Sequence, residues 1–231
     1  MDEPGFFSDL FAPIEKIMTA VLGGLYSLTE AAGVPSYGLA IILLTVLIKI
    51  LVYPLTKKQL QSMKAMQKIQ PKMQKLQEKY KNNPTVMQQK LMEMYQKEGV
   101  NPMAGCLPML IQMPVLMGMY YTLFNFDFGG APPSFLWLPS LAETDPIYVL
   151  PFLSAATTYL TSKTMQSGNA AQNSQMKMMT YIMPLFIGFI SLNFPAGLVL
   201  YWVTMNVVQI VQQLWINRDD GEKPDDDKEA A

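Results

Sequence analysis

A lysine, Lys49, interrupts an otherwise apolar run that covers residues 37–55. An ammonium group in such a run can attract a carboxylate, or serve as a base if burial neutralises it. The chain contains no histidine, which excludes Ser-His and Cys-His catalysis and histidine-ligated zinc. None of the five long apolar segments contains Asp or Glu. Lys49 therefore has no counter-ion within those segments, which argues against a relay of protons through them.

The position of Lys49 allows two interpretations. A lysine at the centre of a membrane span costs about 2.5–3.5 kcal/mol, so it normally faces a partner or a water-filled cavity. However, Lys49 precedes Lys57 by only eight residues, which is about 12 Å of helix. Its side chain can therefore snorkel toward the cytoplasmic headgroups. Two polar residues favour the cavity: Thr45 lies one turn before Lys49, and Gln112 lies inside the second apolar segment.

The last apolar segment carries a stripe of polar side chains. Trp202, Asn206, Gln209 and Gln213 follow one another at spacings of 4, 3 and 4 residues, which places them on one face of a helix. Hydrogen bonds between packed helices are the simpler explanation. The alternative is a hydrated groove that opens to the cytoplasm. Several amides, a hydroxyl and a cation in the same half of the membrane favour the groove.

The elements that must position these residues are helices. Hydrophobic residues make up 50% of the chain and charged residues 15%, against about a quarter in soluble domains. We predict an all-α membrane protein with five transmembrane helices around a hydrophilic groove. The predicted spans cover residues 37–55, 104–124, 147–162, 178–194 and 196–215. The third and fourth are shorter than the roughly 20 residues that cross a bilayer, so we expect them to lie where the membrane is thinned or to be covered by neighbouring helices.

The parts outside the spans have different compositions. Residues 1–36 carry apolar side chains at helical spacing, interrupted by Asp9, Glu15 and Lys16. This pattern predicts an external amphipathic helix in the membrane interface; packing on a soluble partner is the alternative. We assign residues 37–55 to the first span, 56–99 to a cytoplasmic helical hairpin, 100–217 to the other four spans, and 218–231 to a disordered cytoplasmic tail.

The hairpin is strongly basic, with ten lysines and three acidic residues between positions 56 and 99. Asn82-Asn83-Pro84 separates its two helices, whose apolar seams should face each other. The loop at 125–146 has no Lys or Arg. The positive-inside rule therefore places the hairpin and the C-terminus in the cytoplasm and the N-terminus outside.

Six of the nineteen methionines lie in the hairpin. Ordinary packing is one explanation, and contact with varied hydrophobic peptides is the other. The expected contact residues are Met63, Met66, Met73, Lys68 and Lys72.

Four motifs resemble those of the YidC membrane protein insertases, a family that includes the mitochondrial oxidase-assembly and chloroplast Albino-type insertases. They are ILLTVLIKILVYPLTK at 42–57, the hairpin opening at 63–72, NPMAGCLP at 101–108 followed by LIQMP at 110–114, and FPAGLVLYW at 194–202 with Asn206. The resemblance covers essentially the whole chain.

The resemblance implies a five-helix core with a hydrophilic groove that is open to the cytoplasm and to lipid and closed outside. Lys49 takes the place of the groove's positive residue, which is usually an arginine in the family. By resemblance, Thr45, Gln112, Tyr201, Trp202 and Asn206 match other groove or helix-crossing positions. Gln209 joins them through the polar stripe.

We therefore expect a multi-pass membrane protein insertase and chaperone of the bacterial plasma (inner) membrane, with no enzymatic activity and no cofactor. Its partners would be nascent membrane proteins, the lipid bilayer and the ribosome. The insertase itself would act alone or beside the Sec translocon. The acidic tail makes the basic hairpin the expected ribosome contact. We expect no small-molecule substrate and no specific nucleic-acid sequence. A small channel or transporter is the alternative, but it predicts internal repeats, and the sequence has none. An intramembrane hydrolase with Lys49 as base would need Ser154 or Ser191, and neither lies in a motif.

Overall fold

The computed structural model describes residues 6–101, 107–126, 128, 133–165 and 178–221. Within these ranges the protein is helical, as predicted, and its one β feature is an isolated bridge between Phe135 and Leu138. The elements are α1 (Phe6–Ala31), α2 (Tyr37–Leu51), α3 (Tyr53–Lys79), α4 (Pro84–Lys97), α5 (Leu107–Asn125), α6 (Val149–Met165), the π-helical turn η3 (Met178–Ile182), α8 (Met183–Ser191) and α9 (Ala196–Gly221).

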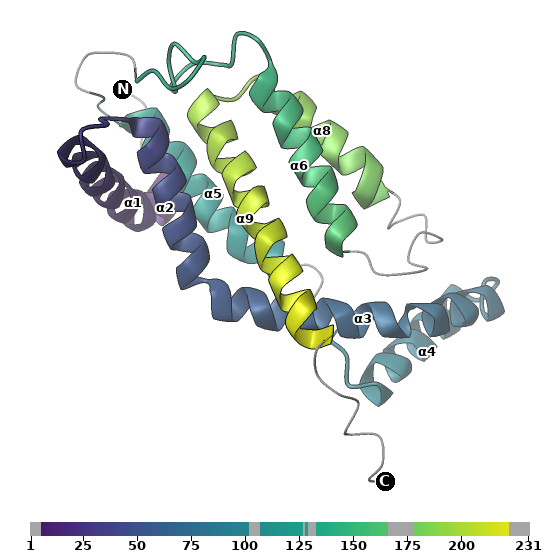
Figure 1. Cartoon of the computed structure of the whole chain (residues 1–231). Helices are drawn as coiled ribbons and strands as arrows, with labels where there is room; N and C mark the ends of the chain where they lie inside the picture. The colour runs from purple at the N-terminus through teal and green to yellow at the C-terminus, as the bar shows by residue number, and fades with distance from the viewer. Residues whose placement is uncertain (1–5, 102–106, 127, 129–132, 166–177, 222–231) are drawn as a thin grey trace.

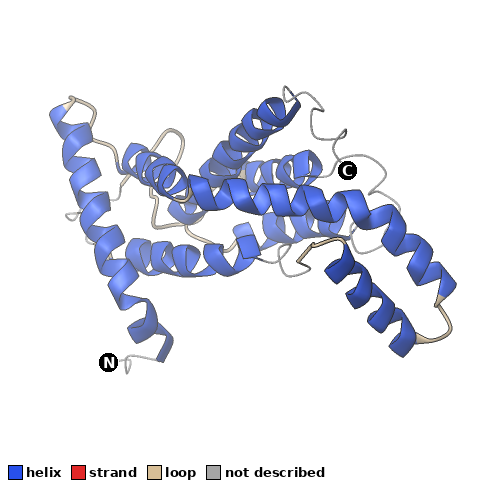
Figure 2. Cartoon of the chain, turned by 90° about the horizontal axis from the view of Figure 1, so that it is seen from below, coloured by secondary structure: helices blue, strands red, loops and turns tan. Residues whose placement is uncertain are grey.

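Helices α2, α5, α6, α8 and α9 run side by side in a bundle with α9 near its centre, and α3 and α4 project from one end (Figure 1). Helix α6 packs against α8 and α9, α2 packs against α9, and α1 packs against α2 and α5. Contacts between α5 and α9 are few by comparison. Viewed from below, α3 lies across that end of the bundle with α4 beside it (Figure 2).

By length and apolar composition alone, one described helix suffices to cross a membrane, namely residues Ala196–Arg218 of α9. Helices α2 and α3 pass the same test only when taken together, and they meet at a bend of 64°. Two other parts of the bundle are short. Helix α2 has 15 residues, and η3 with α8 adds 5 and 9 residues. At 1.5 Å per residue, each is about 21–23 Å long.

The bend after α2 differs from the predicted first span. We expected residues 37–55 to form one helix, but α2 ends at Leu51 and α3 begins at Tyr53. Pro54 lies in the first turn of α3, where its fixed φ and missing N–H suit a helix start. The amides of Leu55 and Thr56 both donate to the carbonyl of Val52. A proline at the end of the apolar run therefore starts a new helix instead of ending the old one.

The hairpin helices separate where the sequence predicts. The Asn83 side chain accepts a hydrogen bond from the amide of Val86, and Pro84 occupies the first turn of α4. The predicted apolar seam is loose, since α4 has no fully buried residue. One weak bond links the two helices at the seam, from the Tyr95 hydroxyl to the sulfur of Met73, at 3.6 Å.

A loop closes the end of the bundle opposite the hairpin. Its residues Leu138 and Leu141 are buried in the core. The first amides of α9 donate to this loop, from Ala196 to the Glu143 carbonyl at 2.7 Å and from Gly197 to the Leu141 carbonyl at 2.8 Å. A Cβ on Gly197 would lie 3.1 Å from the Leu141 oxygen. The Pro-Ala-Gly motif is therefore small because the loop backbone lies directly on it.

Helix α1 uses its apolar face within the chain. Met18 and Leu22 are buried in the core, and a Cβ on Gly118 of α5 would lie 2.6 Å from an Ile14 methyl. The Asn125 amide donates to the Glu15 carboxylate at 2.8 Å. Helix α1 is strongly foreshortened in Figure 1 and seen at full length in Figure 2, so it lies across the bundle axis.

The C-terminal helix is longer than predicted. We expected a disordered tail from residue 218, but α9 continues to Gly221. Arg218 in its last turn favours this, because a cation is stabilising near a helix C-terminus. The motif residues 102–106 and the tail residues 222–231 lie outside the described ranges.

Candidate functional site

Lys49 lies in the last turn of α2, and its ammonium is directed toward α9. Nζ donates a hydrogen bond to Oε1 of Gln209 at 2.8 Å. Ion pairs within the described residues join Lys72 to Glu98 and Lys90 to Glu93. No carboxylate of the described part of the chain is paired with Lys49, so its side-chain partner there is a neutral amide.

A second glutamine of α9 fixes the backbone at Lys49. Nε2 of Gln212 donates to the Lys49 carbonyl at 3.2 Å. Carbonyls in the last turn of a helix lack an intrahelical amide partner, so this bond satisfies a group that the bend leaves open. Gln212 is not among the site residues predicted from the sequence. Its spacing of three residues from Gln209 was the available signal, because residues three apart share a helix face.

The rest of the polar stripe points to a different helix. Nε1 of Trp202 donates to Oγ1 of Thr158 at 3.0 Å. Nδ2 of Asn206 lies 3.0 Å from the same oxygen and 3.2 Å from Oγ1 of Thr157. Gln213 accepts a hydrogen bond from Thr164. These bonds all reach α6, so this part of the stripe joins helices, as the simpler explanation expects. The sequence analysis did not single out the threonines of α6.

Two further predicted site residues form a contact between α5 and α9. Nε2 of Gln112 donates to the Tyr201 hydroxyl at 2.6 Å. Tyr201 is among the most deeply buried large side chains, with 1% of its surface exposed. Thr45 is also buried, and its hydroxyl donates to the Ile41 carbonyl of its own helix at 2.7 Å. Thr45 therefore lies within the α2 packing face, while Gln112 and Tyr201 join two helices.

An apolar cleft of about 380 Å³ separates α5 from α8. Its floor is α9, which contributes Trp202. Trp202 and Gln209 are seven residues apart, two helical turns, so they lie on nearly the same face of α9. The apolar cleft and the Lys49 ammonium are thus connected along one helix. The cleft is lined by Leu116, Met117, Tyr120, Ile187, Ile190, Ser191, Phe194, Leu198, Val199 and Trp202.

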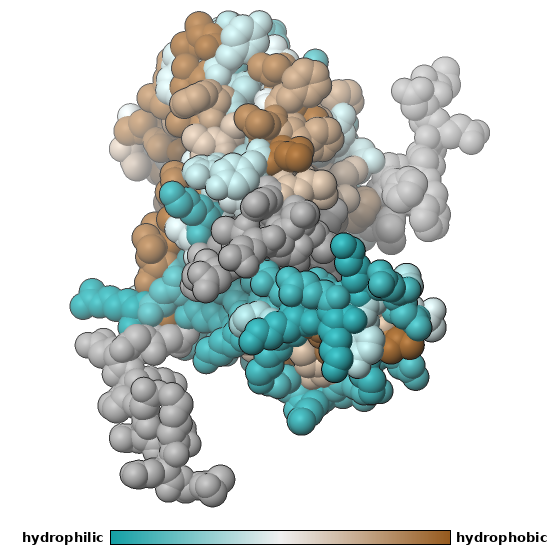
Figure 3. Space-filling model, turned by 90° about the vertical axis from the view of Figure 1, so that its right-hand side faces the viewer, coloured by the Kyte–Doolittle hydropathy of each residue, from teal (hydrophilic) through white to brown (hydrophobic). Residues whose placement is uncertain are grey.

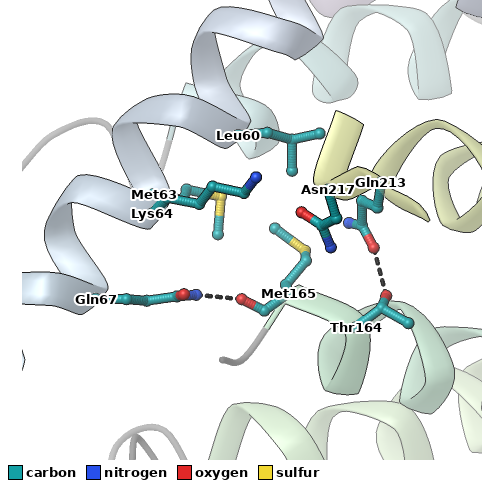
Figure 4. A pocket seen from close by; sticks show the side chains of 8 residues that line it. All are labelled: Leu60, Met63, Lys64, Gln67, Thr164, Met165, Gln213 and Asn217. Atoms are coloured by element: carbon teal, nitrogen blue, oxygen red, sulfur yellow. Dashed lines mark hydrogen bonds between the residues drawn. The ribbon is translucent and has the colours of Figure 1, made fainter. Parts of the chain in front are cut away.

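A small cavity of about 20 Å³ lies where α3 meets the ends of α6 and α9 (Figure 4). Gln67 of α3 donates to the Met165 carbonyl at its edge, and Met63 and Lys64 also line it. Among the described residues, Nε2 of Gln213 is buried and has no hydrogen-bond partner. The volume fits one water molecule. This junction attaches the hairpin to the bundle.

The predicted hairpin contact residues lie in two environments. Met63 and Met66 are half-buried near the bundle, and Met73 faces Tyr95. Lys68 and Lys72 are exposed, and Lys72 forms an ion pair of 2.6 Å with Glu98. Within the described residues, no group of three or more His, Cys, Asp or Glu side chains could hold a metal ion.

Comparisons with known proteins agree with this architecture. The profile of the family described as 60Kd inner membrane protein matches residues 28–223. Membrane protein insertase MisCA of Bacillus subtilis (strain 168) is 48% identical over 200 residues, which cover 85% of this chain and 76% of MisCA. Membrane protein insertase YidC of Clostridium perfringens (strain 13 / Type A) is 41% identical over 218 residues, covering 90% of this chain and 91% of that protein.

Some relatives are much longer. Membrane protein insertase YidC of Geobacter sulfurreducens is 48% identical over 184 residues, but the match covers only 34% of that protein. A crystal structure described as active YidC insertase with the first transmembrane domain resolved superposes with a TM-score of 0.67 at 27% identity. It covers 85% of this chain and 45% of the crystallised one. This chain resembles the MisCA and YidC insertases in sequence and a YidC insertase in fold, and it belongs to the 60Kd inner membrane protein family.

Proposed function

We propose that this chain is a membrane protein insertase that receives hydrophobic segments of nascent proteins from the cytoplasm and releases them sideways into the bilayer. The observation that carries the proposal is a cation with no paired carboxylate among the described residues, connected along α9 to an apolar cleft. Lys49 is held by the neutral Gln209 amide, and the cleft between α5 and α8 is lined almost entirely by apolar side chains. The cation would attract the polar part of a substrate, and the cleft would take its apolar part.

The surface of the bundle supports the proposal that the chain crosses the membrane with five helices. Each helix of the bundle exposes large apolar side chains, among them Ile50 of α2, Phe124 of α5, Phe152 of α6, Phe189 of α8 and Val211 of α9. Soluble monomers rarely expose contiguous apolar patches of this extent. In Figure 3 the hydrophobic bundle lies above a strongly hydrophilic hairpin. This division fits a bundle in lipid and a hairpin in the cytoplasm, with the N-terminus outside and the C-terminus inside.

The short helices support a mechanism for moving polar groups. Helix α2, and η3 with α8, are about 21–23 Å long, against a hydrocarbon core of about 30 Å. A bilayer that thins around them shortens the apolar distance that a translocated segment must cross. A carboxylate 4 Å from the Lys49 ammonium would be attracted by about 4 kcal/mol at an effective dielectric constant of about 20. The segment's hydrophobic part then gains by entering lipid through the cleft.

The hairpin is proposed as the ribosome contact. Lys68 is exposed, and most of the ten hairpin lysines lie on α3, which projects away from the bundle. RNA phosphates attract such a basic surface, and the attraction weakens as salt increases. We expect replacement of Lys68 and Lys75 by glutamate to lower co-sedimentation with ribosomes, with the acidic tail left intact.

The insertase proposal is tested by complementation. A host is depleted of its own insertase and supplied with this chain, and insertion of a short single-span substrate with an acidic translocated tail is followed by protease protection. We expect the wild type to insert the substrate and Lys49→Ala to insert it at least tenfold more slowly, because a tenfold change needs only about 1.4 kcal/mol of the lost attraction. Lys49→Arg should retain activity because it keeps the charge.

Lys163→Ala is the matched control. It removes one exposed lysine from α6, whose ammonium lies over the Tyr159 ring, and should insert the substrate at the wild-type rate. Insertion of no substrate by the wild type would refute the insertase assignment. Equal rates for wild type and Lys49→Ala would refute the role given to Lys49.

A further inference from the structure

We propose that Gln209 is a positioning residue for Lys49, and that its neutrality sets the preference of this protein for acidic translocated segments. The inference rests on the proposed insertase function. Gln209 holds the ammonium in place with an uncharged acceptor, so that the positive charge stays available. An arriving substrate carboxylate then displaces the Gln209 carbonyl oxygen from the ammonium.

The geometry around Lys49 indicates a built site. Gln209 Oε1 accepts from the ammonium at 2.8 Å, and Gln212 Nε2 donates to the carbonyl of the same lysine at 3.2 Å. Two glutamines three residues apart on α9 thus contact Lys49 at both ends, side chain and backbone. Gln212 is 8% exposed, and α2 packs along α9 over this region. The lysine backbone is therefore fixed, and the side chain is directed to α9 rather than to the headgroups.

The chemistry of the acceptor decides what the bond can do. An amide oxygen carries a partial charge, so it orients an ammonium without cancelling it. A carboxylate at the same place would form an ion pair, and a partly buried, hydrogen-bonded ion pair is hard for a competing ligand to open. The ammonium has three N–H donors, and Gln209 uses one of them. An incoming carboxylate can therefore bind before the amide leaves.

A simple structural link between α2 and α9 is the competing explanation, and the two make opposite predictions for Gln209→Glu. An ion pair would strengthen a structural link, so that variant should insert all substrates at least as well as the wild type. If neutrality matters, the new carboxylate should occupy Lys49 and slow the insertion of acidic segments.

The experiment uses the full chain in the depleted host, with two substrates that differ only in a translocated tail that is acidic or neutral. The measured quantity is the ratio of their insertion rates. We expect Gln209→Glu to lower this ratio about tenfold, and Gln209→Met, which keeps the side-chain length but removes the acceptor, to lower it by about two- to threefold. Gln61→Glu makes the same amide-to-acid change at an exposed site on α3 and should leave the ratio unchanged.

The order of the variants decides the outcome. A ratio for Gln209→Glu equal to or above that of the wild type overturns the inference and leaves Gln209 as a structural link. If Gln209→Glu does not accumulate in the membrane, Gln209→Met alone is decisive, because an unchanged ratio refutes the positioning role. Insertion of neither substrate by the wild type would instead refute the insertase function, so the two failures are distinguishable.

Discussion

Replacement of Gly38 by alanine should destabilise the bundle through one contact at the end opposite the hairpin. Gly38 is buried in the first turn of α2, and a Cβ there would lie 2.2 Å from two ring carbons of Phe135. Carbon atoms in contact prefer about 3.5–4.0 Å, so the ring would have to move by more than about 1 Å. Phe135 cannot move freely, since it exchanges two backbone hydrogen bonds, of 3.0 and 2.9 Å, with Leu138.

The magnitude follows from two opposing terms. Overpacking a close-packed site costs about 1–3 kcal/mol. In a helix interior, alanine stabilises the folded state by about 0.5–1 kcal/mol relative to glycine. We expect a smaller gain in the first turn. We therefore expect Gly38→Ala to lower the free energy of unfolding by about 1–2 kcal/mol. In a Phe135→Ala background the clash is absent, and the same change should cost under about 0.5 kcal/mol.

The assay is unfolding of the purified protein in mixed micelles by increasing fractions of sodium dodecyl sulfate, followed by circular dichroism. Gly24→Ala in α1 is the matched control, because nothing lies within 4 Å of its added Cβ. It should stabilise the protein by about 0.5–1 kcal/mol. If Gly38→Ala also stabilises the protein, the close approach of the loop to α2 does not exist in solution and the reasoning fails.

Three further outcomes can be measured on the same preparation. Tyr201→Phe removes the hydroxyl that accepts from Gln112 and should lower the free energy of unfolding by about 0.6–2 kcal/mol. Asp145→Ala removes a buried carboxylate that accepts from the Leu150 amide at the start of α6, and should cost about 2 kcal/mol. Burial raises the pKa of Tyr95 above its ordinary 10.0, so the folded hairpin holds the phenolic proton more tightly than the unfolded chain. The contribution of protonated Tyr95 to the stability of the hairpin is complete below pH 10.0 and is lost as pH rises through the folded-state pKa. Spin labels on α3 and α4 should therefore move apart in this pH range, but not in the Tyr95→Phe variant.

The sequence predicts the features that depend on local chemistry. The Asn83-Pro84 break is a helix start signal, and the structure has a helix starting there with Asn83 as its cap. The family motifs are similarly local, and the comparisons confirm the family. The polar stripe on α9 is also correct as a helical pattern. Spacing alone gives a face of a helix, however, and does not say which helix lies opposite that face.

The partners of the stripe could therefore not be predicted. Trp202 and Asn206 bond to threonines of α6, while Gln209 bonds to Lys49 of α2. These pairings depend on how α9 is placed between two neighbours that come from distant parts of the sequence. Gln212 could not be predicted for the same reason. Its amide donates to the Lys49 carbonyl, which the bend after α2 leaves without a backbone partner.

The two walls of the apolar cleft are attached to different helices, and this bears on how a substrate helix could enter. The α8 wall is tightly packed on α6: a Cβ on Gly188 would lie 2.8 Å from the Ala155 side chain, and the Ser154 and Ser191 hydroxyls are 2.9 Å apart. The α5 wall contacts α9 only sparsely and is packed mainly against α1. Separating α8 from α6 would break buried hydrogen bonds and close packing, which are costly to lose. Displacing α5 together with α1 would break the packing of α1 on α2 and the Gln112–Tyr201 hydrogen bond, but it would leave the packing of α9 on α2 and α6 intact. A cleft that widens on its α5 side would therefore keep Gln209 and the Lys49 ammonium in place.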